Sequence, residues 1–199
     1  MNHKIVAVIL TVIDLICTEW HISDCHVKEI IGIIRLLKAF DLAAASTGLN
    51  EKQLRAAGVP YLRTITHGGS HASYYPGAMQ LSLKLIYSPK GKILGAQAVG
   101  ADGADKRIDV IATAIHAGMS VDDLADLELA YAPPFSSAKD PVNIAGYVAS
   151  NVLRGEQRVI SWDELQALQP GSVQLIDVRT SEEFELGTIP GARHIDLNQ

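Results

Sequence analysis

Cysteine is scarce in this sequence, and both cysteines lie near one end. The 199 residues include two cysteines, Cys17 and Cys25, and no cysteine follows residue 25. Small secreted domains use several cysteines to build a disulfide framework, so this class is excluded and a reducing, cytoplasmic location is expected. A cysteine nucleophile anywhere in residues 26–199 is excluded as well.

Long apolar runs and basic runs are also missing. The apolar stretch near the N-terminus covers residues 5–17 and is interrupted by Asp14, whereas a membrane-spanning helix needs about 20 apolar residues. No small-residue cleavage site follows this stretch, so we expect no export signal. The net charge is −5 and no Lys/Arg-rich run occurs, which predicts a partner that is neither a nucleic acid nor a membrane.

A third absence concerns dinucleotide binding. No G-x-G-x-x-G fingerprint follows a predicted strand and opens a helix, so nothing marks a place where a pyrophosphate would meet a helix N-terminus. We therefore expect no FAD or NAD(P)H site in this chain and assign no cofactor-binding residue. The hydrophobic content of 48% is that of a globular protein with a substantial core.

The sequence divides into three segments. Residues 1–31 are apolar, fit no pattern and stay unassigned. Residues 32–155 alternate strand-like and helix-like patterns, and residues 159–199 are typical of strand, helix, strand, helix after a short polar linker. The expected elements of the middle segment are a buried strand in 32–46, a helix in 48–58, a strand in 59–67, a hairpin in 78–100 and helices in 102–120, 120–131 and 141–155.

Local signals set the ends of several elements. Asn50 followed by Gln53 predicts a capped helix N-terminus, and Gly58 predicts its C-terminal end. Pro141 is suited to the first turn of a helix. In the last segment, Ser161 and Glu164 form a capping-box pattern that opens a small helix.

Several stretches of the middle and last segments are distinctive. The middle segment contains "FDLAAASTGLNEKQL", "HGGSHASYYPGA", "KILGAQAVG" and "ELAYAPPFSSAKDPVNIAG", and the last segment contains "LIDVRTSEEFELGTIPGA". Through its four stretches the middle segment resembles the C-terminal dimerisation domain of pyridine nucleotide-disulfide oxidoreductases, in the branch of the CoA-disulfide reductases and NADH oxidases. Through the last stretch, residues 159–199 resemble the start of a rhodanese domain.

The resemblance implies a fold class. Residues 32–155 are expected to form an α+β domain, an antiparallel sheet with helices on one side. Residues 159–199 are expected to form an incomplete α/β unit, the N-terminal half of a rhodanese-like domain. Such a half would leave an unpaired strand edge, since the centre of a rhodanese sheet is parallel.

The resemblance also implies a function. The chain looks like a fragment of an FAD-dependent, NAD(P)H-linked CoA-disulfide or polysulfide reductase, which would form a homodimer. By itself it would be inactive, because the FAD and NAD motifs, the flavin-side redox cysteine and the rhodanese cysteine are absent. Whether the chain is an enzyme is therefore left open.

Tyrosines are the catalytic residues that the resemblance implies. In the family, tyrosines of the dimerisation domain reach into the disulfide-reduction site of the partner subunit, and the matching positions are Tyr74 or Tyr75 and Tyr131. A phenol can donate a proton or a hydrogen bond to a leaving thiolate. The alternative is that they are interface aromatics with satisfied hydroxyls. His71, in the same loop, is expected to be a surface residue.

Two other functions remain open. The chain could be a free-standing interaction module that pairs with an intact flavoprotein reductase. It could also be a small zinc-binding protein that uses residues 17–26, where Cys17, His21 and Cys25 recur every four residues. This spacing matches no standard zinc module, so no metal ligand is assigned.

The rhodanese resemblance assigns no catalytic residue. Asp177 and Arg179, at the end of an expected strand, match charges that are largely structural in that family. Thr188 occupies the position where the family usually has a histidine.

Overall fold

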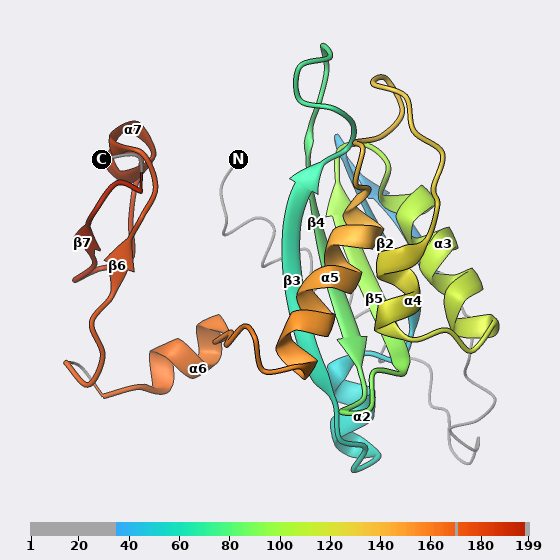
Figure 1. Cartoon of the computed structure of the whole chain (residues 1–199), viewed down its shortest axis with the longest axis horizontal. Coiled ribbons are helices and arrows are strands. Elements are labelled where there is room, and N and C mark those ends of the chain that lie inside the picture. The colour runs from blue at the N-terminus through green and yellow to red at the C-terminus, as the bar shows by residue number, and fades with distance from the viewer. Residues whose placement is uncertain (1–34, 170, 198–199) are drawn as a thin grey trace. The chain divides into compact units, whose positions relative to one another are not determined.

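The computed structural model describes residues 35–169 and 171–197, in two compact units, Met1–Arg158 and Val159–Gln199 (Figure 1). The unassigned N-terminal segment, including residues 17–26 considered above for zinc, lies outside the described residues. Within the described portion of the chain, none of the helices has the length and apolarity needed to cross a bilayer.

Five antiparallel strands form the sheet of the first unit. Their spatial order is β1-β2-β5-β4-β3. The expected α+β fold, an antiparallel sheet with helices, is confirmed, and so is the hairpin between β4 and β5. The strands are β1 (Arg35–Ala39), β2 (Leu42–Gly48), β3 (Leu62–Gly69), β4 (Gln80–Tyr87) and β5 (Ile93–Gly100).

The buried strand expected in residues 32–46 corresponds to β2, whose residues 44–47 are buried, but the described part of this stretch also contains a second strand, β1. The chain reverses there, so that β1 pairs with β2 as an antiparallel hairpin. The turn passes through Phe40, which adopts a φ of 55° although it is not a glycine. The three central residues of β1 are exposed, because β1 lies at the edge of the sheet.

Four helices accompany the sheet: α2 (Glu51–Ala56), α3 (Ala104–His116), α4 (Val121–Asp126) and α5 (Pro141–Leu153). Helix α3 packs on β2 and β5, α5 packs on β3 and β4, and α4 packs on α5, so these three cover one face of the sheet. The capping box of Asn50 and Gln53 is present, and Pro141 stands in the first turn of α5, as predicted.

Helix α4 is shorter than the predicted helix in 120–131. It ends at Asp126, since Leu127 is already in an extended conformation with ψ of 128°. The side-chain amide of Asn143 donates to the carbonyl oxygens of Leu124 at 3.0 Å and of Leu127 at 2.9 Å. These bonds satisfy carbonyls that a longer helix would have bonded internally, and they attach the end of α4 to α5.

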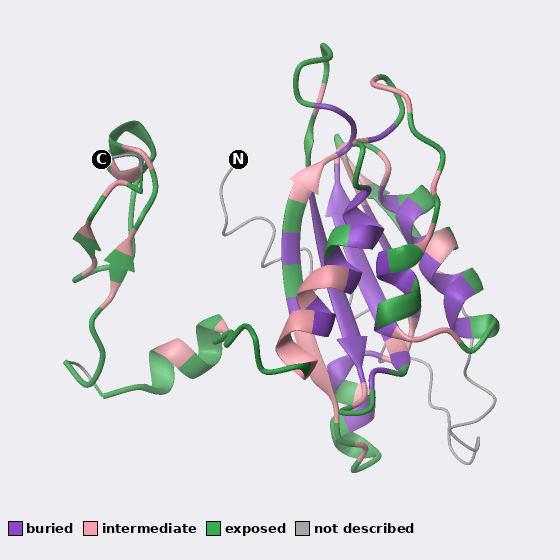
Figure 2. Cartoon of the chain, in the orientation of Figure 1, coloured by how far each residue is buried: buried purple, intermediate pink, exposed green. Residues whose placement is uncertain are grey.

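The core of the first unit lies between the sheet and its helices. Leu83 and Leu85 of β4 belong to the same buried cluster as Ile108 and Ile111 of α3. Figure 2 shows that β4 and β5 are buried along most of their length. Gly146 permits a close crossing of α5 and α4, because a Cβ there would lie 2.6 Å from the backbone nitrogen of Ala125.

The second unit contains only short elements: α6 (Trp162–Ala167), β6 (Ile176–Asp177), α7 (Ser181–Glu185) and β7 (Arg193–His194). The two strands pair in parallel. The strand, helix, strand, helix pattern expected here is met only in part, because residues 159–160 form no strand and residues 173–178 contain only the two-residue β6. No residue among 159–169 and 171–197 is fully buried. Little apolar surface is therefore removed from water among the described residues of this unit.

We expect amide hydrogen exchange to separate the two units. Backbone amides in residues 80–117 should exchange slowly, because their strands and α3 carry the buried cluster. Backbone amides in residues 159–197 should be among the fastest to exchange, because their hydrogen bonds can open without disrupting a hydrophobic core. Exchange measured by mass spectrometry on peptides from both regions tests this expectation, and equal protection in the two would contradict it.

Candidate functional site

Two loops meet at one end of the first unit. One loop, residues 70–79, joins β3 to β4, and the other, residues 127–140, joins α4 to α5. Both project beyond the same end of the sheet (Figure 1). A hydrogen bond from the backbone nitrogen of Ala72 to the carbonyl oxygen of Ser136, 3.1 Å long, joins them. The tyrosines singled out from the sequence lie on these two loops.

The hydroxyl oxygens of Tyr74 and Tyr131 lie 2.9 Å apart and share a hydrogen bond. Both side chains are open to solvent, with 74% of Tyr74 and 48% of Tyr131 exposed. The hydrogen bond from Tyr131 raises the pKa of Tyr74 above the usual tyrosine value. Tyr74 therefore keeps its proton at neutral pH and can take part in hydrogen bonding as a neutral phenol.

A pair of phenols can act as a single hydrogen-bond donor. One hydroxyl donates to the other, and the proton of the accepting hydroxyl is then free to point outward. Because hydrogen bonds in a chain polarise one another, the outer hydroxyl becomes a better donor than a lone phenol. An anion such as a thiolate is the kind of group that this arrangement can stabilise.

Tyr75 does not join the pair. Its ring packs edge-on against the imidazole of His71, with ring centroids 5.8 Å apart. His71 was expected at the surface, but it is only 7% exposed, so that expectation was wrong. Its Nδ1 lies 3.2 Å from the carbonyl oxygen of Ala72, within its own loop. His71 is thus buried in the loop, whereas the Tyr75 ring that contacts it is still 43% exposed.

Sequence reasoning missed a buried ion pair beneath the loops. Arg107 of α3 and Asp140, the N-cap of α5, lie 2.9 Å apart and are 1% and 3% exposed. Arg107 stands four residues before Ile111 on the buried face of α3, and this position was the available signal. Removing one partner of such a pair costs about 3–5 kcal/mol, since the other charge is left buried without compensation.

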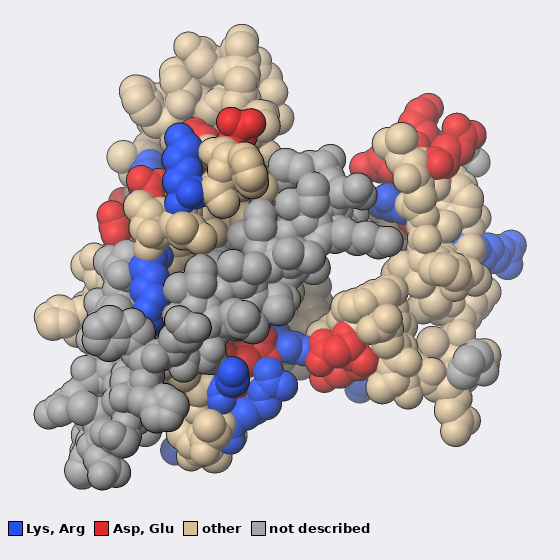
Figure 3. All heavy atoms as spheres, turned by 180° about the vertical axis from the view of Figure 1, so that it is seen from behind, with Lys and Arg blue, Asp and Glu red and all other residues tan. Residues whose placement is uncertain are grey.

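A second charged cluster surrounds Glu51 at the start of α2. Its carboxylate forms ion pairs with Lys84 and Arg63 and accepts a hydrogen bond from Tyr61 at 3.1 Å. Burial opposes ionisation of Glu51, but the two cations outweigh it and hold the pKa of this carboxyl below its usual value. In Figure 3, seen from behind, basic and acidic side chains likewise lie next to one another on the described surface.

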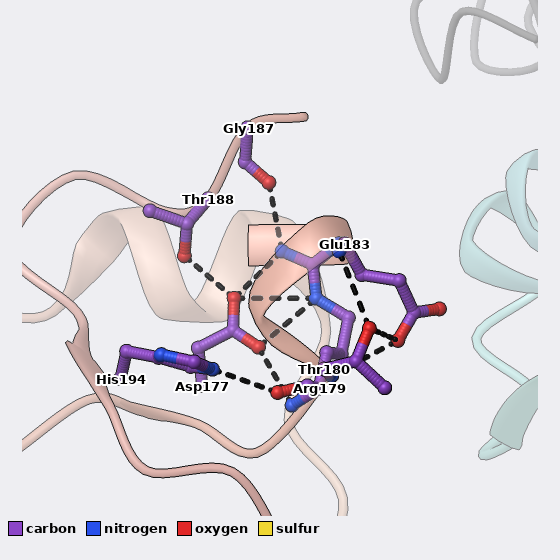
Figure 4. A network of polar contacts seen from close by, with 7 residues as sticks. All are labelled: Asp177, Arg179, Thr180, Glu183, Gly187, Thr188 and His194. Atoms are coloured by element: carbon purple, nitrogen blue, oxygen red, sulfur yellow. Dashed lines mark hydrogen bonds and ion pairs between the residues drawn. The ribbon is translucent and has the colours of Figure 1, made fainter. Parts of the chain in front are cut away.

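The second unit has a polar network around Asp177 (Figure 4). Arg179 binds this carboxylate with Nη2 at 2.6 Å, and the Thr188 hydroxyl donates to it at 2.7 Å. Arg179 and Thr188 thereby lower the pKa of Asp177 below its usual value. Arg179 also donates to the carbonyl oxygen of Gly187 at 2.7 Å. The network thereby joins the residues before α7 to those after it. The described residues of this unit, 159–169 and 171–197, include no cysteine beside this network.

Metal binding has no support in the described residues. Within 35–169 and 171–197 no group of three or more potential ligands is close enough to hold an ion. The cysteines and histidine of the zinc alternative lie outside these residues.

Comparison with known proteins finds a family model that matches each of the two units. The family model for the pyridine nucleotide-disulphide oxidoreductase dimerisation domain matches residues 35–141, and the model for the rhodanese-like domain matches residues 161–199. The coenzyme A disulfide reductase of Staphylococcus epidermidis is 41% identical over 128 residues, which are 64% of this chain and 28% of that protein. The enzyme of the same name from Staphylococcus aureus is 43% identical over 115 residues. The chain thus spans under a third of the length of these relatives.

Two solved structures share the fold with substantial identity. Reduced CoADR-RHD from Bacillus anthracis has a TM-score of 0.80 at 49% identity, and the NAD-dependent persulfide reductase from A. fulgidus has a TM-score of 0.75 at 40% identity. Each likeness covers 83% of this chain and 30% of the other. The chain belongs to the pyridine nucleotide-disulphide oxidoreductase family, of which it carries the dimerisation domain followed by a rhodanese-like segment.

Proposed function

We propose that this chain is part of an FAD-dependent, NAD(P)H-linked reductase that acts on CoA disulfide, persulfides or polysulfides. The observation that carries the proposal is the Tyr74–Tyr131 hydroxyl pair, exposed at one end of a dimerisation domain. Similarity to enzymes named coenzyme A disulfide reductase and persulfide reductase supports the substrate class. By itself the chain is inactive, because it carries neither a dinucleotide fingerprint nor a cysteine after residue 25.

The role of the phenols follows from the chemistry of disulfide cleavage. When bound, flavin reduced by NAD(P)H would supply the two electrons that convert a disulfide into two thiolates. Cleavage of a disulfide converts one sulfur into a leaving thiolate, which becomes easier to expel when a neighbouring group donates a hydrogen bond or a proton to it. Tyr74 and Tyr131 supply this donor, and they do so across a two-fold axis to the site of the partner subunit.

A homodimer fits the composition of this end of the molecule. Large apolar side chains gather on the two loops, and Phe135 is 71% exposed. Exposed aromatic clusters mark interaction surfaces, and a two-fold contact is the commonest arrangement of identical chains. The same surface could pair with an intact reductase subunit, which makes a free-standing interaction module the second candidate. With two cysteines in the chain, a cytoplasmic setting suits either function.

A chimeric enzyme tests the function. Residues 35–199 would replace the matched stretch of the Bacillus anthracis reductase, to which the chain is 49% identical. We expect NADH- or NADPH-dependent reduction of CoA disulfide, and we expect Tyr74→Phe and Tyr131→Phe to lower kcat on the order of 10²-fold through loss of the proton donor. Tyr147→Phe, on α5 and outside the hydroxyl pair, is the matched control. A folded, flavin-loaded chimera that keeps full turnover in both variants would refute the role of the phenols.

Dimerisation is tested on the full chain. Phe135→Glu should weaken self-association at micromolar concentration, because it places a charge in the apolar surface of the loops. The control is Ala57→Glu, an equally drastic change at the exposed C-terminal end of α2, at the opposite end of the sheet. Sedimentation equilibrium gives the mass of each variant. If the unaltered chain sediments as a folded monomer, the homodimer proposal is wrong.

Cofactor content gives an independent test. The purified chain should carry no stoichiometric FAD and should form no thiocyanate from thiosulfate and cyanide, since neither a dinucleotide fingerprint nor a cysteine in residues 26–199 is available. Visible absorbance detects flavin, and a ferric thiocyanate assay detects sulfur transfer. Yellow protein with one flavin per chain would overturn the first expectation, and cyanide-dependent thiocyanate would overturn the second.

A further inference from the structure

We propose that the buried Arg107–Asp140 ion pair, with Ser136, is the positioning element that brings the hydroxyls of Tyr74 and Tyr131 together. Neither charged residue contacts a phenol. Each is attached to the base of one tyrosine-bearing loop, so the pair determines where the two loops stand relative to each other. The catalytic meaning of this arrangement rests on the proposed function, whereas the arrangement itself can be measured without any activity.

The first attachment holds loop 70–79. Arg107 Nη2 donates to the carbonyl oxygen of Ser70 at 2.7 Å. Ser70 also closes the loop, since its backbone nitrogen donates to the carbonyl oxygen of Met79 at 2.8 Å and its hydroxyl accepts from the Met79 nitrogen at 3.2 Å. The guanidinium therefore binds this loop at the point where its two ends meet, four residues before Tyr74.

The second attachment holds loop 127–140. The Ser136 hydroxyl donates to Asp140 Oδ2 at 2.6 Å, and this carboxylate oxygen is the one that Arg107 Nη2 contacts. The carbonyl oxygen of Ser136 accepts a hydrogen bond from the Ala72 nitrogen at 3.1 Å. This bond links loop 127–140 directly to loop 70–79. Ser136 is completely buried. A closed ring of hydrogen bonds thus runs from Arg107 through both loops, below the exposed phenols.

The geometry requires an arginine. Its guanidinium donates through Nε to Asp140 Oδ1 at 3.3 Å, through Nη2 to Ser70 and Asp140, and through Nη1 to the carbonyl oxygen of Gly103 at 3.3 Å. A lysine has one ammonium group and cannot hold these partners in a plane. Gly103 leaves the necessary space, because a Cβ there would lie 2.1 Å from Nη1.

The experiment reads the phenol pair directly in the full chain labelled with 3-fluorotyrosine. Fluorine NMR resolves the Tyr74 signal, which is assigned by its loss in Tyr74→Phe, and its chemical shift is followed as pH rises. The bond from Tyr131 raises the pKa of Tyr74, so Tyr131→Phe lowers the titration midpoint and defines the value of an unpaired Tyr74. Fluorination lowers the intrinsic pKa of a phenol, so the titration is followed at a less alkaline pH than with ordinary tyrosine.

We expect Arg107→Met to move the Tyr74 midpoint down to the Tyr131→Phe value, and Arg107→Lys and Ser136→Ala to move it a fraction of the way. Arg154→Met is the matched control, because Arg154 is exposed and lies 3.5 Å from Asp122, and it should leave the midpoint unchanged. A folded Arg107→Met chain with the unaltered midpoint would overturn the proposal. If Arg107→Met does not fold, the Tyr74 midpoint is measured in Ser136→Ala instead. An unchanged midpoint in folded Ser136→Ala would also overturn the proposal.

The same substitutions in the reductase chimera separate this inference from the proposed function. If both are right, Arg107→Lys lowers kcat and shifts the Tyr74 midpoint, with the KM for CoA disulfide less affected. A shifted midpoint with full turnover would support the positioning of the phenols and refute their role in catalysis. An unshifted midpoint would refute the positioning whatever the turnover.

Discussion

One buried ion pair organises the functional end of the first unit. Arg107 and Asp140 come from two helices that both pack on the sheet, and apolar contacts alone would fix only how closely those helices approach. The pair adds direction, because each polar atom must find a partner at a defined angle when water is excluded. Asp140 contributes twice, since its Oδ1 also accepts from the Val142 nitrogen at 3.0 Å and caps α5. One carboxylate thereby bonds to the N-terminus of α5, to Ser136 of the loop before it and to Arg107 of α3.

The features that sequence reasoning predicted correctly are those decided by neighbours in the chain. Asn50 and Gln53 bond each other across three residues, at 2.8 and 3.0 Å, so the start of α2 could be predicted from the spacing alone. Pro141 in the first turn of α5 follows from its fixed φ and missing donor. The hairpin of β4 and β5 is indicated by alternation and by Gly91, whose φ is 81°.

The features that escaped prediction depend on partners far along the chain. Helix α4 ends where it does because Asn143, 16 residues after Leu127, binds its last carbonyls. Arg107 is separated from Asp140 by 33 residues, and a charged side chain on a helix is normally taken to face water. The sequence left Tyr74 and Tyr75 as alternatives, and only the fold shows that Tyr74 is the one that reaches Tyr131, 57 residues away.

The turn at Phe40 has a consequence for which residues the fold favours there. A side chain other than glycine or asparagine in the left-handed region costs roughly 1–2 kcal/mol, and Phe40 recovers almost none of it, since the residue is 98% exposed. Its ring also stays in contact with water in the folded chain. The folding of this unit therefore gains almost nothing from an aromatic ring at position 40, and a glycine there would remove the backbone strain.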